Sequence, residues 1–555
     1  MSSHASAVLS DELSLRKNNH NNHRYFLLLL SALLLHGLLW TVTPLFFLPN
    51  YHIDTMEMMV IGQNRVIATF KHPAFQGWVV ELYSLLTNRS EAAPYLAAQT
   101  ACLLSVLLVW RFAKEFLPPK YALLAALTLL SYFYFHYDST VYNNRTFMRF
   151  FWLAAVCSLY FALKENKMRY WILTGAALGL GLYCKFTVFI LIAVILAFMF
   201  LEPAARKYWK TAGPYLSTSV CFILTVPLLL HFLYLPQAVA EMTEYTFTSI
   251  GDADPDFRDR FFSPLRFALT QIPILLVLLL PLFPVLGVRR ISGRINLRTD
   301  FAGRFLTFFI FAPFFVQLVI AFVCAGDMRT ALGCHLWLLL PLYLLYMIKI
   351  PPERERMFAR SAVIVFCSIF LFAALTAISV TISPVLTGKD SRPHFPGKDL
   401  AKAVQQIWAD RYSSPLPYVR GEDWCAEAVC CYVRPHPVLY SKLWTTEEDF
   451  VRKGGILLWL IGENNQIPRH SGRNCYENDE FRYSPATGLP EEEWLALFPN
   501  KEILPPLELS PKTIVPVPPI KIGIAVVPPA GVVPAGILPA SVLPVVPAAL
   551  TERIK

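Results

Sequence analysis

A polar stretch near the start of the chain brings together the side chains that acid–base chemistry needs. It runs from residue 51 to residue 78, YHIDTMEMMVIGQNRVIATFKHPAFQGW, directly after the first apolar run. Within it Asp54 and Glu57 are three residues apart, so on a helix both carboxylates share one face. Charges beside an apolar run are costly unless they are solvated, paired or used in chemistry. The stretch therefore predicts a carboxylate site at a membrane surface, and an ordinary solvated loop is the alternative interpretation.

The elements that must position these carboxylates are membrane helices. The 555 residues are 55% hydrophobic and 16% charged, and the mean hydropathy is +0.45. Apolar runs of about 20 residues, the length that crosses a bilayer, recur along the chain. We therefore expect a polytopic α-helical membrane protein with about eleven transmembrane helices. The expected spans are 25–48, 93–112, 121–137, 147–163, 170–183, 187–201, 214–235, 265–286, 305–325, 331–348 and 362–382.

The distribution of positive charge predicts the orientation. The net charge is +10. Lysine and arginine concentrate in alternate loops, such as 111–120, 164–169, 206–210 and 289–298, and are sparser in the loops between them. By the positive-inside rule the basic loops and the N-terminus lie in the cytoplasm, and the C-terminus lies outside. The charge thus directs membrane insertion, and we expect no nucleic-acid partner.

Composition divides the chain into four expected parts. Residues 1–24 are a polar cytoplasmic segment, and residues 25–383 form a transmembrane catalytic domain whose first outer loop covers 49–90. Residues 384–503 have a soluble composition and are expected to form a small extracytoplasmic α/β domain. Residues 504–555 carry a proline every few positions, which excludes a helix and predicts a disordered or polyproline tail.

The expected outer domain contains helix, strand and cysteine signals. The segment 395–412 has helical periodicity, and 416–421 and 454–462 are typical of strands. In an extracytoplasmic domain a disulfide between Cys475 and one of three earlier cysteines is expected, with the partner left open. A zinc site is the weaker interpretation because no ligand spacing fits. The three earlier cysteines are Cys425, Cys430 and Cys431.

Four short motifs occur in the order found in a known family. Asp54 and Glu57 lie in the first outer loop, and the segment 72–74, His-Pro-Ala, follows with Trp78. A span rich in small residues, LGLGLYCKFT, ends at 185–187, Lys-Phe-Thr. Late in the chain, GDMRTALG contains Arg329 and Gly333. In these motifs residues 25–385 resemble the GT-C superfamily of integral membrane glycosyltransferases, which is dolichyl-phosphate-mannose-protein mannosyltransferase-like, and more closely its bacterial Rgt-like and aminoarabinose-transferase-like branch.

The chain departs from the pattern of that family at three points. The family's HPP-like segment is His-Pro-Ala here, and the common Asp-Glu pair is spread over residues 54–57. Residues 330–332 interrupt the expected aromatic spacing after Arg329. These departures weaken the transfer of individual residue roles more than the family resemblance.

The resemblance implies an enzyme that moves a sugar from a polyprenyl-phosphate carrier to a hydroxyl outside the membrane. It places the catalytic acidic residue in the first outer loop, so Asp54 is the expected general base of an inverting displacement. Glu57 is expected to share that role, to position the acceptor or to hold a metal. The acceptor is expected to be an envelope glycan such as lipopolysaccharide core, a lipid or a protein. The bacterial branch implies a multi-pass protein of the bacterial plasma (inner) membrane.

The departing lipid phosphate requires positive charge near the interface. Lys185 and Arg329 are the first candidates, because both lie at expected outer ends of spans, and Lys71 and His72 are further candidates. The alternatives are that Lys185 only extends to the membrane surface and that Arg329 only pairs with Asp327.

Other site assignments concern the acceptor and a metal. Tyr142, Asn143 and Asn144, in a short outer loop, are candidate contacts of the sugar or acceptor. Glu57 and His72 are the candidate ligands of a divalent metal, but two ligands make a weak site. No other cofactor is expected, and the expected partners are the lipid-linked sugar, the acceptor and membrane lipids.

Three other functions compete with glycosyl transfer. A transporter or flippase of a lipid-linked glycan would be expected to show internal repeats and polar residues at mid-membrane, whereas the polar clusters lie at outer ends of spans. A noncatalytic scaffold is disfavoured by Asp54 and by the Lys-Phe-Thr motif. A nucleotide-sugar enzyme is disfavoured because the cytoplasmic loops contain no glycine-rich phosphate loop.

Overall fold

The computed structural model divides the chain into two units. One comprises Met1–Phe395 with Pro511–Val517, and the other comprises Pro396–Ser510 with Pro518–Lys555. The structure describes residues 2–69, 71–235, 239, 257–287, 298–324, 329–388, 392–441, 444–461, 497–498 and 500–531, with the backbone alone for residues 2–21, 259 and 324.

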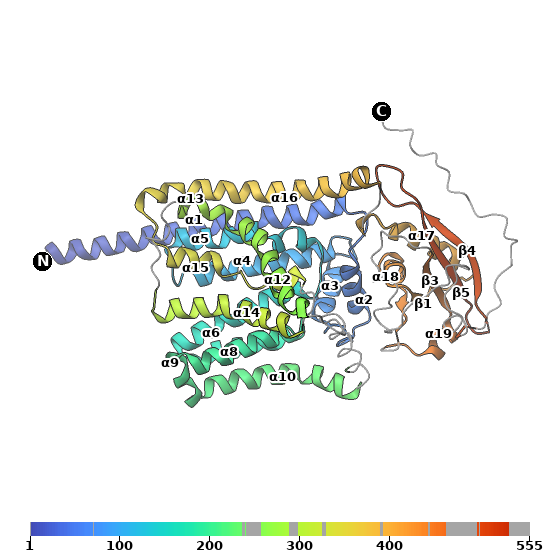
Figure 1. Cartoon of the computed structure of the whole chain (residues 1–555), viewed down its shortest axis with the longest axis horizontal. Helices are drawn as coiled ribbons and strands as arrows, with labels where there is room; N and C mark the ends of the chain where they lie inside the picture. The colour runs from blue at the N-terminus through green and yellow to red at the C-terminus, as the bar shows by residue number, and fades with distance from the viewer. Residues whose placement is uncertain are drawn as a thin grey trace. The chain divides into compact units, whose positions relative to one another are not determined.

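The first unit is a bundle of helices that lie side by side in Figure 1. The longest helices in it are α1 (Ser2–Phe47), α4 (Ala93–Ala113), α6 (Arg145–Glu165), α10 (Ala212–Tyr234), α12 (Phe257–Leu279), α14 (Phe301–Cys324) and α16 (Phe358–Thr387). Shorter helices complete it: α2 (Ile53–Gln63), α3 (Phe75–Leu86), α5 (Pro119–Thr128), α7 (Met168–Leu182), α8 (Val188–Leu201), α9 (Pro203–Arg206), α13 (Phe283–Leu286) and α15 (Leu340–Met347).

Among the described residues, seven helical segments are long and apolar enough to cross a membrane, and α8 with the segment after it forms an eighth, bent one. This confirms a multi-pass integral membrane protein. The other three expected spans contain the shorter helices α5, α7 and α15, so eleven remains the predicted number.

In two of these shorter spans the α-helix covers only part of the span, and the rest is irregular backbone and short 3-10 helices inside the bundle. After α5 the chain continues in the short 3-10 helices η1 (Leu129–Ser131), η2 (Phe133–Phe135) and η3 (Tyr137–Thr140), and η7 (Thr330–Gly333) precedes α15. Free backbone groups at this depth need internal partners. The Tyr134 hydroxyl donates to the Thr330 carbonyl at 2.7 Å, and Gln317 Nε2 donates to the Leu332 carbonyl at 3.1 Å.

Small residues bring helices close together, as the sequence of the span at 170–183 predicts. A Cβ added to Gly175 of α7 would lie 2.1 Å from the Ser217 carbonyl oxygen of α10. A Cβ on Gly62 of α2 would lie 2.1 Å from the Gly77 carbonyl oxygen of α3. Neither glycine can carry a side chain without moving a helix apart from its neighbour.

The second unit is a small α/β domain built on a five-stranded sheet of order β2-β1-β3-β5-β4. Strands β1 (Tyr418–Gly421), β2 (Val438–Leu439) and β3 (Gly455–Ile461) are parallel to one another, and β5 (Ile520–Val527) pairs antiparallel with both β3 and β4 (Glu502–Leu509). The helices are α17 (Gly397–Ala409), α18 (Asp423–Tyr432) and α19 (Glu447–Lys453). The predicted helix and both predicted strands are therefore present.

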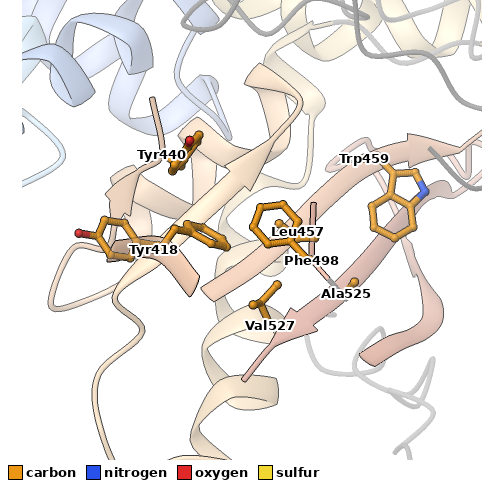
Figure 2. Packing of buried hydrophobic residues seen from close by; sticks show 8 residues of the cluster. Tyr418, Tyr440, Leu457, Trp459, Phe498, Ala525 and Val527 are labelled. Atoms are coloured by element: carbon orange, nitrogen blue, oxygen red, sulfur yellow. The ribbon is translucent and has the colours of Figure 1, made fainter. Parts of the chain in front are cut away.

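The core of this sheet is apolar and largely aromatic (Figure 2). Phe450 of α19 packs on Tyr418 of β1 with ring centroids 5.6 Å apart and on Phe498 at 5.1 Å. Ala525 and Val527 supply the contribution of β5 to the same cluster. Burial of these side chains is what ties the late strand β5 to the earlier ones.

The predicted boundaries of the tail and of the outer domain are wrong. Residues 520–527, expected in a disordered tail, form a central strand, because IKIGIAVV is an apolar, proline-free run. Pro505 and Pro506 are accommodated in the edge strand β4, where the register shifts between Leu504 and Leu507. Helix α16 continues to Thr387, and the second unit begins at Pro396, not at residue 384.

Two sequence predictions for the outer domain lie partly outside the described residues. Cys425, Cys430 and Cys431 are buried, whereas Cys475, their predicted disulfide partner, is not among the described residues. The predicted tail beyond residue 531 also lies outside them. The disulfide stays a prediction.

Candidate active site

Asp54 lies in the first turn of α2, where its charge suits the helix N-terminus. The His52 side chain caps the helix, since its Nδ1 accepts a hydrogen bond from the Asp54 backbone N–H at 3.2 Å. Met56 and Val60 are fully buried and hold the helix in the bundle. The Asp54 carboxylate itself is 35% exposed and lies 3.8 Å from His52 Nδ1. It is a fixed carboxylate that a substrate can reach.

Positive charges surround Asp54. Burial alone raises the pKa of its carboxyl group, but the His52 ring and the charges of Lys71 and Arg145 outweigh burial and lower that pKa to about 2. Burial lowers the pKa of His52, whose Nδ1 accepts the capping hydrogen bond. Asp54 is therefore an anion at neutral pH, held in a cationic environment.

Glu57, the second carboxylate of α2, is placed differently from Asp54. Its side chain is only 4% exposed, and its Oε2 accepts a hydrogen bond from Lys71 Nζ at 2.9 Å. Lys71 is 15% exposed. The two form a largely buried ion pair between α2 and the loop that precedes α3.

A tight turn carries Lys71 and His72. The Thr69 backbone N–H donates to the His72 carbonyl, and Thr69 Oγ1 accepts from the His72 backbone N–H at 3.0 Å. Ala68 and Pro73 form an isolated antiparallel bridge that closes the turn. The turn presents Lys71 toward α2 and His72 toward the segment before α6.

The predicted acceptor contacts are part of the protein scaffold. Tyr142 is fully buried, and its hydroxyl donates to the Gln76 carbonyl at 2.8 Å. Asn143 is buried and accepts from the Arg145 backbone N–H at 2.9 Å. Asn144 is buried beside the His72 ring, with its Nδ2 2.9 Å from His72 Nδ1. Because these side chains are buried and bonded within the protein, they are poorly placed to contact a sugar directly.

Lys185 lies between α7 and α8, at the same end of the bundle as Asp54. The Phe75 backbone N–H donates to the Tyr183 carbonyl at 3.2 Å, which joins this segment to α3. Burial lowers the pKa of Lys185 to about 8, and the charges of Arg145 and Arg329 act in the same direction, while Asp54 opposes them. Lys185 therefore lies within electrostatic range of Asp54 and of Arg329, another cation predicted from the sequence.

Arg329 is exposed and immediately precedes η7. Two side chains hold the backbone next to Arg329. The Thr330 carbonyl accepts a hydrogen bond from the Tyr134 hydroxyl and another, at 3.4 Å, from Gln271 Nε2. Asp327, the predicted partner of Arg329, lies outside the described residues.

Three charged residues of the site were not predicted. Asp138 of η3 accepts from Arg149 Nη1 at 3.0 Å through Oδ2 and from Arg145 Nη2 at 3.4 Å through Oδ1. Arg145 and Arg149 belong to the first two turns of α6. The signal in the sequence is one carboxylate followed by two arginines where a short loop meets an apolar run. Charges at such a place are costly to leave unpaired.

The two candidate metal ligands face different partners. Glu57 pairs with Lys71, and His72 contacts Asn144. Within the part of the chain that the structure describes, no three His, Cys, Asp or Glu side chains form a metal-binding group. The metal assignment stays a prediction.

An apolar cavity of about 350 Å³ opens among α7, α8 and α10. Leu178, Leu196 and Phe222 are among the side chains that line it. Phe186, which follows Lys185 in the chain, and Phe232 line it as well, and both pack on the cluster of Ala68, Tyr183 and Leu228. The cavity therefore reaches the region of Lys185 and of the turn that carries Lys71.

Comparisons with known proteins show a family match over part of the chain and a similar fold in solved structures. Residues 71–231 match the family described as dolichyl-phosphate-mannose-protein mannosyltransferase. No curated protein sequence matches the chain significantly. The crystal structure of ArnT from Cupriavidus metallidurans bound to undecaprenyl phosphate superposes with a TM-score of 0.57 at 10% identity, covering 91% of this chain and 98% of that chain.

Two further structures are similar. The apo state of the same ArnT gives a TM-score of 0.55 at 12% identity, with the same coverage of both chains. The archaeal oligosaccharyltransferase AglB from Archaeoglobus fulgidus gives a TM-score of 0.42 at 13% identity, covering 77% of this chain and 69% of that chain, and we draw nothing from so low a score. The family match over 71–231 and the ArnT-like fold confirm the resemblance of this chain to the GT-C superfamily of integral membrane glycosyltransferases, dolichyl-phosphate-mannose-protein mannosyltransferase-like.

Proposed function

We propose that the chain is a glycosyltransferase that moves a sugar from a polyprenyl-phosphate donor to an acceptor hydroxyl on the extracytoplasmic face of a bacterial inner membrane. The observation that carries this proposal is the accessible, ionised Asp54 among the cations Lys71, Arg145 and Lys185, with an apolar cavity that is lined by Phe186, the residue after Lys185. Family match and fold support the reaction class.

The donor occupies this region in two parts. Its phosphate binds Lys185 and Arg329, whose side chains are not committed to a carboxylate among the described residues. Its polyprenyl chain lies in the apolar cavity next to Phe186, where burial of hydrocarbon stabilises binding. The ArnT crystal structure contains bound undecaprenyl phosphate, which motivates the choice of carrier.

Asp54 acts as the general base. It takes the proton of the acceptor hydroxyl while the acceptor oxygen attacks the anomeric carbon from the face opposite the phosphate, which inverts the configuration. A pKa of about 2 makes a weak base. The negative charge of a phosphate bound nearby disfavours the ionised carboxylate, so it raises this pKa and strengthens the base once the donor is in place.

Glu57 has a positioning role in this scheme. Its ion pair with Lys71 fixes the turn at 69–73 against α2, and thereby sets the distance between the base and the phosphate site. Tyr142 and Asn144 act in the same way through Gln76 and His72, and Asn143 through the backbone N–H of Arg145. The acceptor, an envelope glycan or glycolipid, then approaches from the exposed side of Asp54.

The test is sugar transfer by the purified chain in nanodiscs with a panel of radiolabelled polyprenyl-phosphate sugars and a membrane glycolipid extract as acceptor. Radiolabelled nucleotide sugars serve as the control donors. Transfer from a polyprenyl-phosphate sugar, with loss of label from the carrier, is the expected result. Transbilayer movement of the donor in liposomes without any transfer would contradict the proposal and favour a flippase.

A further inference from the structure

We infer that Arg145 is an additional ligand of the donor phosphate, held in place by Asp138 and Arg149; this inference rests on the function proposed above. Arg145 begins α6, directly after the buried segment that contains Asn143 and Asn144. No motif of the sequence indicated it.

The charge balance around Asp138 leaves Arg145 incompletely neutralised. One carboxylate, 11% exposed, faces two guanidinium groups. Arg149 is the better bound of the two, because its contact is 3.0 Å, its side chain is 2% exposed, and the Tyr134 and Phe135 rings lie 5.9 and 5.7 Å from its charge. Arg145 has the longer contact of 3.4 Å. Asp138 can balance only one of the two charges that contact it, and Asp54, which acts on Arg145 without a direct contact, leaves room for an anionic ligand on this side chain.

The free donors of Arg145 suit a phosphate. Its Nε is buried and has no hydrogen-bond partner among the described residues, while Nη2 makes the one long contact with Asp138. The side chain is 17% exposed, so a ligand can reach it. A guanidinium group presents parallel N–H donors that match two phosphate oxygens. A buried, unsatisfied N–H is costly, and a bound phosphate oxygen would satisfy it.

Arg145 also lies centrally among the predicted site residues. Its positive charge lowers the pKa values of Asp54, His72 and Lys185. A phosphate at Arg145 would therefore lie within electrostatic range of both Asp54 and Lys185.

The negative charge on the phosphate grows during the reaction, so the positive charge of Arg145 stabilises it increasingly. The bond between the anomeric carbon and the phosphate oxygen breaks, and its electron pair stays on the phosphate, while the acceptor oxygen bonds to the same carbon and its proton goes to Asp54. A phosphodiester with one negative charge thus becomes a phosphomonoester with two. Cations at this position stabilise the transition state more than the bound donor.

The experiment measures binding of undecaprenyl phosphate and of undecaprenol to the full chain in nanodiscs, without turnover. Arg145→Gln is compared with wild type and with Arg89→Gln, a control arginine that pairs with Glu81 in α3. We expect wild type to prefer the phosphate lipid, Arg145→Gln to bind it about tenfold to a hundredfold more weakly, and Arg89→Gln to bind as wild type does. Binding of undecaprenol should not change in any variant.

Each outcome decides one point. If wild type prefers the phosphate lipid and Arg145→Gln binds it equally well, the role of Arg145 is refuted and the proposed function stands. If wild type does not distinguish phosphate from alcohol, the proposed function fails and this inference fails with it. Arg145→Lys keeps the charge and loses the parallel donors, so an affinity between those of wild type and Arg145→Gln supports two-oxygen binding. Thermal unfolding of each variant tests whether the fold is retained. Equal losses of affinity for undecaprenyl phosphate and for undecaprenol would indicate damage to the fold and contradict the inference.

Discussion

Replacing Glu57 with Gln should destabilise the membrane unit by about 3 kcal/mol. Lys71 Nζ and Glu57 Oε2 are 2.9 Å apart, which at an effective dielectric constant of about 20 corresponds to a Coulomb attraction of about 6 kcal/mol, much of it offset by desolvation. Removing one partner of a buried pair typically costs about 3–5 kcal/mol, because the remaining charge stays desolvated. Lys71 keeps 15% of its side-chain surface exposed, so we expect the lower end of that range.

The assay is denaturant unfolding of the purified protein in micelles, with matched variants. Glu115→Gln removes the carboxylate of a more exposed pair with Lys164, 46% exposed, and should cost less than about 1 kcal/mol. Glu57→Met combined with Lys71→Met removes both buried charges and should recover most of the lost stability. If Glu57→Gln unfolds as wild type does but loses sugar transfer, Glu57 takes part in the chemistry and the structural role assigned here is wrong.

Three further predictions concern pH, packing and the sheet. Burial lowers the pKa of Lys185 to about 8, so its charge is lost as pH rises through that value; donor affinity should fall between about pH 7 and pH 9, and Lys185→Arg should abolish the fall. Gly62→Ala places a Cβ 2.1 Å from the Gly77 carbonyl oxygen, so it should separate α2 from α3 and reduce sugar transfer and thermal stability together. Gly37→Ala is the control and should reduce neither by a comparable amount, because its Cβ would meet Leu103 Cδ1 at 3.4 Å, an ordinary van der Waals contact. Truncation before Pro518 removes β5 from between β3 and β4 and should abolish cooperative unfolding of the second unit, while truncation after Gly531 leaves β5 in place and should not; equal behaviour of the two truncations would contradict the sheet order.

The parts of the fold that depend on local composition could be predicted from the sequence. Long apolar runs specify the membrane helices, and helical periodicity over 395–412 specified α17, with Leu400 and Val404 buried. Asp54 and Lys185 were predicted because charged residues at the ends of apolar runs stand out. Strand β5 was missed because the prolines around it dominated the composition, whereas the strand is stabilised by burial against β3, more than fifty residues earlier.

The partners of charged side chains could not be predicted. The spacing of Asp54 and Glu57 in the sequence does not say which of the two is buried. Only the packing of α2 decides that Glu57 is buried against Lys71 while Asp54 stays accessible. Asp138 meets Arg149 because η3 turns back toward the start of α6. Such contacts depend on tertiary structure, which hydropathy and motif spacing do not encode locally.

The assignment of Asp54 as the general base is tested by the rate of sugar transfer by Asp54→Asn with a saturating polyprenyl-phosphate sugar. Removing a general base should lower the rate by about a hundredfold to ten-thousandfold, while binding of undecaprenyl phosphate and thermal stability remain close to those of wild type. Asp410→Asn, at the end of α17 in the second unit, is the matched control and should transfer at the wild-type rate. Undiminished transfer by Asp54→Asn would contradict the assignment of Asp54 as the base and would direct the search to the other carboxylates of the site.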